Sequence, residues 1–312
     1  MNLFLLQGIQ FANLKVINLS ECDSIIKLPE LCAPNLEILN LHRCKNLVEV
    51  DESIGYLDNL QNWELTDCEN LHILPSRLML KSLYIFRLEG CSRLEKFPDI
   101  QPEMNCLSVL ELQHSGIRDL PSSIGYLTML KCLNLYDCQN LMELPDTIYK
   151  LRLLDELSIC TTKLIPTHDP FDSFSEYGFM RLKHLYLNDG GNPIELDFLS
   201  KPNYFPVLKF LDLNGTNISA IPERISKFTR LEGLRIDNCK QLQEIPSLPQ
   251  SISKVYATNC LSLNPQSLSR LLTKVSLSLS LSLSLSLSLY IYIYISHKET
   301  HLLFFPNTLL DY

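Results

Sequence analysis

Residues 130–145 read LKCLNLYDCQNLMELP, a string in which leucines recur at short intervals on both sides of a cysteine. Nearly the same string occurs at 36–50 as LEILNLHRCKNLVEV and at 231–246 as LEGLRIDNCKQLQEIP. A chain that repeats one short pattern predicts a stack of similar structural units. The pattern within one unit therefore decides the fold.

The pattern Leu-x-x-Leu-x-Leu returns about every 23 residues, within the roughly 20–29 residues of leucine-rich repeats. Its first apolar position is occupied in turn by Leu14, Leu36, Leu60, Leu83, Leu107, Leu130, Leu154, Leu182, Leu208, Leu231 and Ile252. The alternation of leucine with other residues predicts a short strand with one buried face. Because each unit returns through its own remaining residues, we expect successive strands to pair in parallel.

We therefore predict an α/β fold, a leucine-rich-repeat solenoid in the form of a curved horseshoe. The parallel sheet is expected on the concave face, and short helical turns with proline-containing loops on the convex face. Strands pack about 4.8 Å apart, whereas the turns opposite need more room, and the stack must curve. The array is predicted to span residues 1–272 in about eleven units, followed by a low-complexity tail at 273–312.

A cysteine stands three positions after the last strand leucine in most units. These cysteines are Cys22, Cys44, Cys68, Cys91, Cys138, Cys239 and Cys260, and other units carry Ser115, Thr162, Gly190 or Thr216 there. We expect these small side chains to turn inward and hydrogen-bond the backbone of a neighbouring unit, with the thiols reduced and inert. Zinc binding is the alternative, but no two cysteines have C-x-x-C spacing.

An apolar residue followed by proline closes many units, as in Leu120-Pro121 and Ile221-Pro222. Proline lacks an N–H donor, so we expect no second regular sheet on that side. The stretches SSIGYL and DTIYKL that follow such prolines predict short helical turns on the outer surface. Trp63 and Phe86 replace the second strand leucine of their units and are expected to fill the core.

The repeat spacing lengthens between Ile165 and Leu208. Aromatic residues of this region include Phe171, Phe174 and Tyr177. They predict loops that contact a partner, or rings that cover the edge of the core. We interpret the adjacent His168 and Asp169 as a solvated pair rather than as acid–base machinery.

The tail reads LSLSLSLSLSLSLYIYIYIS from residue 277. A CT dinucleotide tract that runs into a TA tract would encode Leu-Ser and then Tyr-Ile repeats in one frame. We therefore interpret residues 273–312 as disordered or as an artefact of the gene model. A membrane helix and an exposed strand are the alternatives, and the many serines argue against the helix.

Charge and motifs exclude several function classes. The net charge is −8, the isoelectric point is near 5.4, and no Lys/Arg-rich cluster occurs, so we expect no nucleic-acid partner. The N-terminal apolar run lacks a basic leader, which argues against a secretory signal. We find no metal-ligand spacing, phosphate-binding loop or nucleophile motif. We therefore expect no enzyme activity and no cofactor.

The chain resembles one family over residues 11–263. The matching phrases are LKVINLSECDSIIKLPEL, LPSSIGYL, FPVLKFLDLNGTNISAIPERISKF and CKQLQEIPSLPQSISKVYATNCLSL. They are similar to the leucine-rich repeats of plant intracellular nucleotide-binding immune receptors of the type with a Toll/interleukin-1-receptor-like N-terminal domain. The resemblance implies a module that recognises a pathogen effector or a guarded host protein, contributes to autoinhibition, and works in the cytoplasm or nucleus rather than in a membrane.

The sequence has no G-x-x-x-x-G-K-[ST] motif and no region that resembles the signalling domain, so we expect a truncated form of such a receptor. Two alternatives stay open. One is an extracellular leucine-rich-repeat binding protein or inhibitor, which N-x-[ST] motifs at Asn18, Asn214 and Asn217 would suit. The other is a non-functional gene fragment.

The candidate partner-binding residues are those expected on the concave face, between or just after the strand leucines. They are Asn40, Arg43, Glu64, Arg87, Glu111, Tyr136, Tyr186, Phe210, Asp212, Arg235 and Tyr256. The set leans acidic, which favours a protein partner with a basic patch, and we expect no enclosed pocket for a small molecule. Alternatively, Glu64, Arg87 and Glu111 form a cross-strand charge ladder that serves register and solubility, and the tyrosines are then the better binding candidates.

Overall fold

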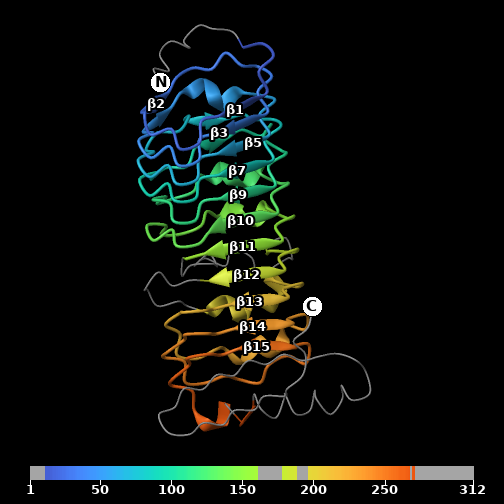
Figure 1. The fold of residues 1–312 in the computed structure, drawn as a ribbon. Coiled ribbons are helices and arrows are strands. Elements are labelled where there is room, and N and C mark those ends of the chain that lie inside the picture. Colours follow the sequence, from blue (N-terminus) through green and yellow to red (C-terminus); the bar gives the residue numbers. More distant parts are fainter. Residues whose placement is uncertain (1–10, 161–177, 188–195, 268, 271–312) are drawn as a thin grey trace, which may run out of the picture.

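The computed structural model describes residues 11–160, 178–187, 196–267 and 269–270. Figure 1 shows these residues as a regular stack of repeats. The predicted contact loops with Phe171, Phe174, Tyr177 and His168 lie outside the described residues, as do Thr162, Gly190 and the tail at 273–312.

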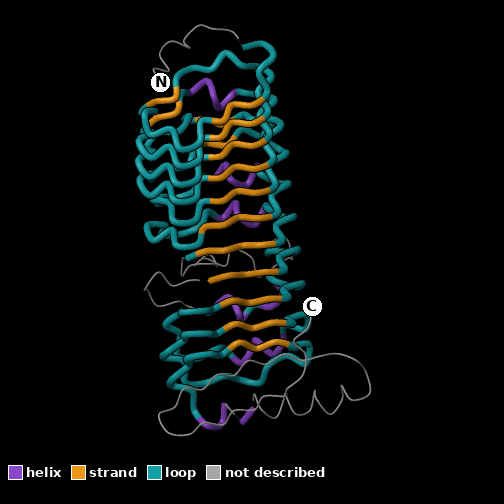
Figure 2. Tube along the Cα trace, in the orientation of Figure 1, coloured by secondary structure: helices purple, strands orange, loops and turns teal. Residues whose placement is uncertain are grey.

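Each repeat contributes one strand to a single parallel sheet of eleven strands (Figure 2). The strands are β1 (Val16–Asn18), β3 (Ile38–Asn40), β5 (Asn62–Glu64), β7 (Ile85–Arg87), β9 (Val109–Glu111), β10 (Cys132–Leu135), β11 (Glu156–Ile159), β12 (His184–Leu187), β13 (Phe210–Asp212), β14 (Gly233–Arg235) and β15 (Lys254–Tyr256). Neighbours pair at equivalent positions of their repeats, so Leu39 lies opposite Trp63 and Trp63 opposite Phe86. The predicted solenoid and its parallel sheet are confirmed.

The strand leucines form the core. Leu36, Leu39 and Leu41 are 0% exposed, and equivalent leucines of the following repeats are buried as well. Burying one leucine contributes about 1.5–3 kcal/mol, but ordering the backbone costs about 1–2 kcal/mol for each residue. One repeat alone cannot offset that cost. The stack is stable because each repeat covers the apolar faces of two neighbours, which makes stability cooperative along the array.

Trp63 and Phe86 extend the leucine rows with larger side chains. Both are fully buried, and their rings stack with centroids 4.6 Å apart and planes 11° from parallel. Such an offset stack contributes about 0.5–1.5 kcal/mol beyond the burial of its area. The prediction that both residues fill the core is confirmed.

Short 3₁₀ helices lie on the side opposite the sheet, and three of them directly follow a proline. They are η2 (Glu52–Tyr56), η3 (Ser122–Tyr126), η4 (Asp146–Lys150) and η7 (Glu223–Lys227), with η5 (Asp197–Ser200) and η6 (Pro202–Tyr204) in a longer repeat. Pro121, Pro145 and Pro222 cap three of them, each with φ between −60° and −67°. Proline is suited to this position because a helix start has no use for its missing N–H. The predicted helical turns are confirmed.

The expectation of no second regular sheet is wrong in two places. Strand β2 (Lys27–Leu28) pairs with β4 (Glu49–Val50), and β6 (Arg77–Leu78) pairs with β8 (Asp99–Ile100). Proline removes a donor only at its own position, so the two residues beside it remain free to pair. Each ladder is nevertheless only two residues long, and this side builds no sheet comparable to the main one.

The repeated cysteines form a ladder of thiol hydrogen bonds. In six units the thiol donates to the carbonyl at the end of the preceding strand, with sulfur–oxygen distances of 2.9–3.3 Å. The pairs are Cys44 to Leu19, Cys68 to Leu41, Cys91 to Leu65, Cys138 to Leu112, Cys239 to Leu213 and Cys260 to Ile236. The predicted contact with a neighbouring unit is thus confirmed for these six cysteines. Thr216 differs, because its hydroxyl donates to the carbonyl of Leu213 within its own repeat.

We predict that Trp63→Ala lowers the free energy of unfolding by about 3–5 kcal/mol, because it leaves a large cavity beside Phe86. Urea unfolding of the two proteins measures the difference. Met142→Ala is the control, since Met142 is 76% exposed and its truncation should change stability by less than about 0.5 kcal/mol. Equal losses in both variants would contradict the buried stack.

Thiol chemistry gives a second prediction. Burial raises the pKa of Cys68 to about 12, so almost none of it is thiolate, the form that reacts, at pH 8. Cys106 is exposed. We expect a disulfide reagent to modify Cys106 within the native protein and Cys68 only after unfolding, as read by mass spectrometry of peptides. Rapid labelling of Cys68 in folded protein would contradict the ladder.

Candidate functional site

The outward side chains of the eleven strands form one continuous surface, which we call the sheet face. Its central row is Asn18, Asn40, Glu64, Arg87, Glu111, Asn134, Ser158, Tyr186, Asp212, Arg235 and Tyr256, one residue from each strand. These residues lie opposite one another along the row, as Asn134, Ser158 and Tyr186 do. Strand alternation produces the row, because the leucines on either side of each member point into the core.

Glu64, Arg87 and Glu111 pair across three strands of the central row. Arg87 Nη1 lies 3.4 Å from a carboxylate oxygen of Glu64, and Arg87 Nε lies 2.7 Å from one of Glu111. The predicted charge ladder is confirmed. Two carboxylates share one guanidinium, so the group keeps a net negative charge.

Arg235 organises a second cluster further along the row. Its guanidinium lies 3.3 Å from Asp212 and 3.5 Å from Asp237, and its central carbon is 5.1 Å from the centre of the Tyr256 ring. Asp212 is buried. Burial raises the pKa of its carboxyl group, while the hydrogen bond from the Asn214 N–H and the charge of Arg235 oppose the rise.

The residue just before each ladder cysteine, and the residue before Ser115 at the equivalent position, has a left-handed backbone conformation. Its φ is 56° at Arg43, 58° at Asp67, 57° at His114 and 55° at Asp137. This region is uncommon for residues other than glycine. The turned backbone places these side chains beside the sheet face, where they pair across repeats: Arg43 Nε lies 3.3 Å from Asp67, and His114 Nδ1 lies 2.9 Å from Asp137.

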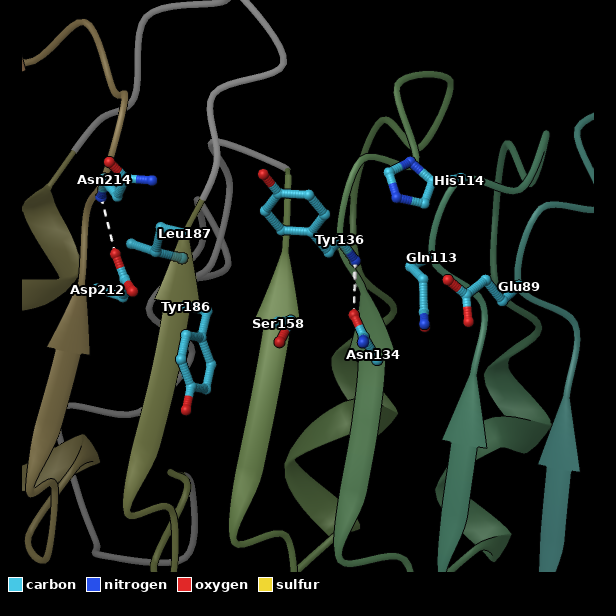
Figure 3. Close-up of a pocket in the computed structure, with 10 residues that line it drawn as sticks. All are labelled: Glu89, Gln113, His114, Asn134, Tyr136, Ser158, Tyr186, Leu187, Asp212 and Asn214. Atoms are coloured by element: carbon cyan, nitrogen blue, oxygen red, sulfur yellow. Dashed lines mark hydrogen bonds between the residues drawn. The ribbon is translucent and has the colours of Figure 1, made fainter. Parts of the chain in front are cut away.

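A hollow of about 300 Å³ lies in the middle of the sheet face. It is lined by Glu89, Gln113, His114, Asn134, Tyr136, Ser158, Tyr186, Leu187, Asp212 and Asn214. Figure 3 shows Ser158 between the strands that carry Tyr136 and Tyr186, with Glu89 and Asp212 on opposite sides. The hollow is open to solvent along the sheet, so it suits a group presented by a larger partner better than an enclosed small molecule.

The structure brings some of the sequence-predicted residues together and separates others. Tyr136, Tyr186 and Asp212 line the hollow. The Phe210 ring lies 6.1 Å from that of Tyr186. Arg235 and Tyr256 adjoin this group through Asp212. Asn40 and Arg43 belong to the repeat of β3, far along the stack, where the Asn40 side chain accepts a hydrogen bond from the His42 N–H.

The candidate set left out several residues that line the hollow, among them Glu89, Gln113, His114 and Ser158. The signal for Ser158 was present in the sequence, because it has the shortest side chain in the central row. A short residue between Asn134 and Tyr186 leaves a gap in an otherwise filled row. Glu89 and His114 stand at strand exits, where only the backbone turn aims their side chains toward the hollow.

Within the described ranges, no group of three or more His, Cys, Asp or Glu residues is arranged to hold a metal ion. The same part of the chain contains no helix long and apolar enough to cross a membrane. All eleven cysteines lie in the described part and are free.

Residues 79–284 match the leucine-rich repeats of RPS4B-like disease resistance proteins. The chain belongs to this family. TMV resistance protein N of Nicotiana glutinosa is 29% identical over 259 residues, which cover 67% of this chain and 22% of that protein. Disease resistance protein RPS4B of Arabidopsis thaliana is 29% identical over 220 residues, covering 70% of this chain and 17% of that protein.

The chain thus spans about a fifth of the length of these disease resistance proteins. Among solved structures, the leucine-rich repeat domain of the type III effector XopL has a TM-score of 0.37 at 19% identity, covering 69% of this chain and 58% of that one. InlJ of Listeria monocytogenes has a TM-score of 0.43 at 16% identity, covering 76% and 61%. At the level of the family, leucine-rich repeats are protein-interaction modules rather than catalytic domains.

The charge ladder gives a third prediction. Arg87→Met leaves Glu64 and Glu111 without their shared cation, and we expect a loss of about 1 kcal/mol in the free energy of unfolding at low salt. The loss should shrink in about 1 M NaCl, because salt screens both the lost attraction and the new repulsion. Arg118→Met is the control, since among the described residues the one ion pair of Arg118 is with the exposed Glu95. A loss that salt leaves unchanged would show that Arg87 acts through packing instead.

Proposed function

We propose that this chain is the recognition region of a plant disease resistance protein and that its sheet face binds a protein partner. Membership in the family of RPS4B-like leucine-rich repeats supports the immune role. The partner class in this proposal is a pathogen effector or a guarded host protein, met in the cytoplasm or nucleus. The same surface contributes to autoinhibition when the receptor has no ligand.

The observation that carries the proposal is the composition and extent of the sheet face. Eleven strands spaced by about 4.8 Å span about 50 Å, which is long enough for the roughly 800 Å² that each side of a standard protein interface buries. Tyr136, Tyr186 and Tyr256 stand on this surface with partly exposed rings. Tyrosine is enriched among the residues that dominate binding energy.

The charge of the sheet face supports a partner with a basic patch. The two arginines of the central row, Arg87 and Arg235, are each shared by two carboxylates. Glu89 and Glu156 also face outward, and within the described part of the chain neither forms an ion pair. Unpaired carboxylates on an acidic surface steer a positively charged partner and favour its orientation.

A charge-reversal experiment tests the proposal. Proximity labelling in plant cells that express the 312-residue chain supplies candidate partners, and calorimetry measures their affinity for purified variants. We expect the double variant Glu89→Lys/Glu156→Lys to bind its partner at least about tenfold more weakly. The deficit should narrow as salt is raised, because the lost attraction is electrostatic.

The matched control is Glu30→Lys/Glu143→Lys, which makes the same change in net charge at exposed positions outside the sheet face. It should bind with unchanged affinity. Partners that tolerate the sheet-face variant but lose affinity for the control would place the binding surface elsewhere and overturn the proposal.

A further inference from the structure

The hollow in the sheet face exists because the central row is interrupted by its shortest side chain. Ser158 lies in register between Asn134 and Tyr186. The space above it, about 300 Å³, is at the small end of ligand pockets. It is large enough for one long side chain of a partner, together with water.

The walls of the hollow are aromatic and acidic. Tyr136 and Tyr186 stand on either side of Ser158, and Glu89 and Asp212 close the two ends (Figure 3). None of the ten lining residues is a lysine or an arginine. The one lining residue that could carry a positive charge, His114, already contacts Asp137 at 2.9 Å.

Several polar groups of the hollow can accept a hydrogen bond from a ligand. Ser158 is 7% exposed, and in the described part of the chain its hydroxyl makes no hydrogen bond. The side-chain oxygen of Gln113 is buried and has no partner among the described residues either. With the Glu89 carboxylate, these groups fit a ligand that offers several donors and no acceptor, which is the character of a guanidinium group.

The sheet face already holds guanidinium groups in this way. Arg87 lies between Glu64 and Glu111. Arg235 lies between Asp212 and Asp237 and over the Tyr256 ring. Like the surroundings of Arg235, the hollow combines carboxylates with tyrosine rings, and it has no arginine of its own.

The electrostatic environment of the residues beside the hollow also favours a positively charged ligand. Burial raises the pKa of the Tyr186 hydroxyl, and the charges of Glu156 and Asp212 raise it further. Burial, and then the charges of Glu156 and Glu111, raise the pKa of Cys132 to about 12. Negative charge thus surrounds the hollow on the strands beside it.

We propose that the hollow is a receptor for one arginine side chain from a loop of the partner protein. The planar guanidinium stacks against Tyr136 or Tyr186, donates to Ser158 beneath it, and lies in the negative field of Glu89 and Asp212 at the two ends of the hollow. Arginine is favoured over lysine because only the guanidinium is flat and presents five donors. This inference rests on the proposed function, since it specifies which side chain of the partner protein the sheet face binds.

The test uses N-acetyl-arginine amide as the probe, with the full chain carrying ¹³C-labelled tyrosine rings for NMR. We expect the ring signals of Tyr136 and Tyr186 to shift with half-saturation at about 1–10 mM, while Tyr56 and Tyr126 on the opposite side stay in place. N-acetyl-citrulline amide, which has the same shape without the charge, should cause no saturable shift. N-acetyl-lysine amide should bind at least about threefold more weakly.

Three variants make the test specific. Ser158→Tyr fills the hollow with a tyrosine, the residue that its neighbour Tyr186 already carries, and should abolish the shifts. Asn40→Tyr introduces a tyrosine in the same row far from the hollow and should leave the shifts intact. Glu89→Gln keeps the shape, removes one carboxylate and should weaken binding by about threefold to tenfold. If Ser158→Tyr does not fold, the affinity of Glu89→Gln for the probe tests the site on its own.

Equal shifts with citrulline or lysine, equal shifts at Tyr56, or binding that survives both Ser158→Tyr and Glu89→Gln would overturn the arginine site. The probe needs no partner protein, so this failure is separable from failure of the proposed function. If the probe does not bind but Glu89→Lys/Glu156→Lys still weakens a partner, the sheet face is a binding surface and the hollow is not its arginine site.

Discussion

The structure depends on the contact between the apolar face of one repeat and that of the next. Leu39, Trp63 and Phe86 meet in register, fully buried, and the rows continue along the stack. No repeat has an interior of its own, because a unit of about 23 residues cannot enclose one. The sheet, the thiol hydrogen bonds and the alignment of outward side chains all follow from this stacking.

Stacking also separates stability from recognition. Along each strand the inward leucines hold the array together, and the outward residues face solvent in a fixed lattice. Ser158 and Tyr186 can therefore differ in size by a whole aromatic ring while Leu157 and Leu185 pack identically beside them. A surface of this kind can hold very different side chains over one unchanged core.

The repeat, the parallel sheet, the buried Trp63 and the cysteine contacts could be predicted from the sequence, because each follows from a local pattern repeated many times. The pairing of Arg87 with both neighbours was predictable for the same reason. The short ladders formed by β2 with β4 and by β6 with β8 were missed, because they depend on how far one proline affects the residues beside it. The hollow was missed as well. It depends on the size of Ser158 relative to its row and on the left-handed turns that aim side chains such as His114, and neither is visible in one repeat alone.

The thiol ladder has a direction. Six of the ladder cysteines donate backward, each to a carbonyl at the end of the strand in the unit before it. Each of these thiols therefore satisfies an acceptor of the preceding unit. A duplication or deletion of one whole unit keeps every donor beside an acceptor, whereas a change of a few residues misaligns the leucine rows and the thiols together. Arrays of this design can lengthen or shorten by recombination between units, and the outward surface then gains or loses one strand's worth of contacts at a time.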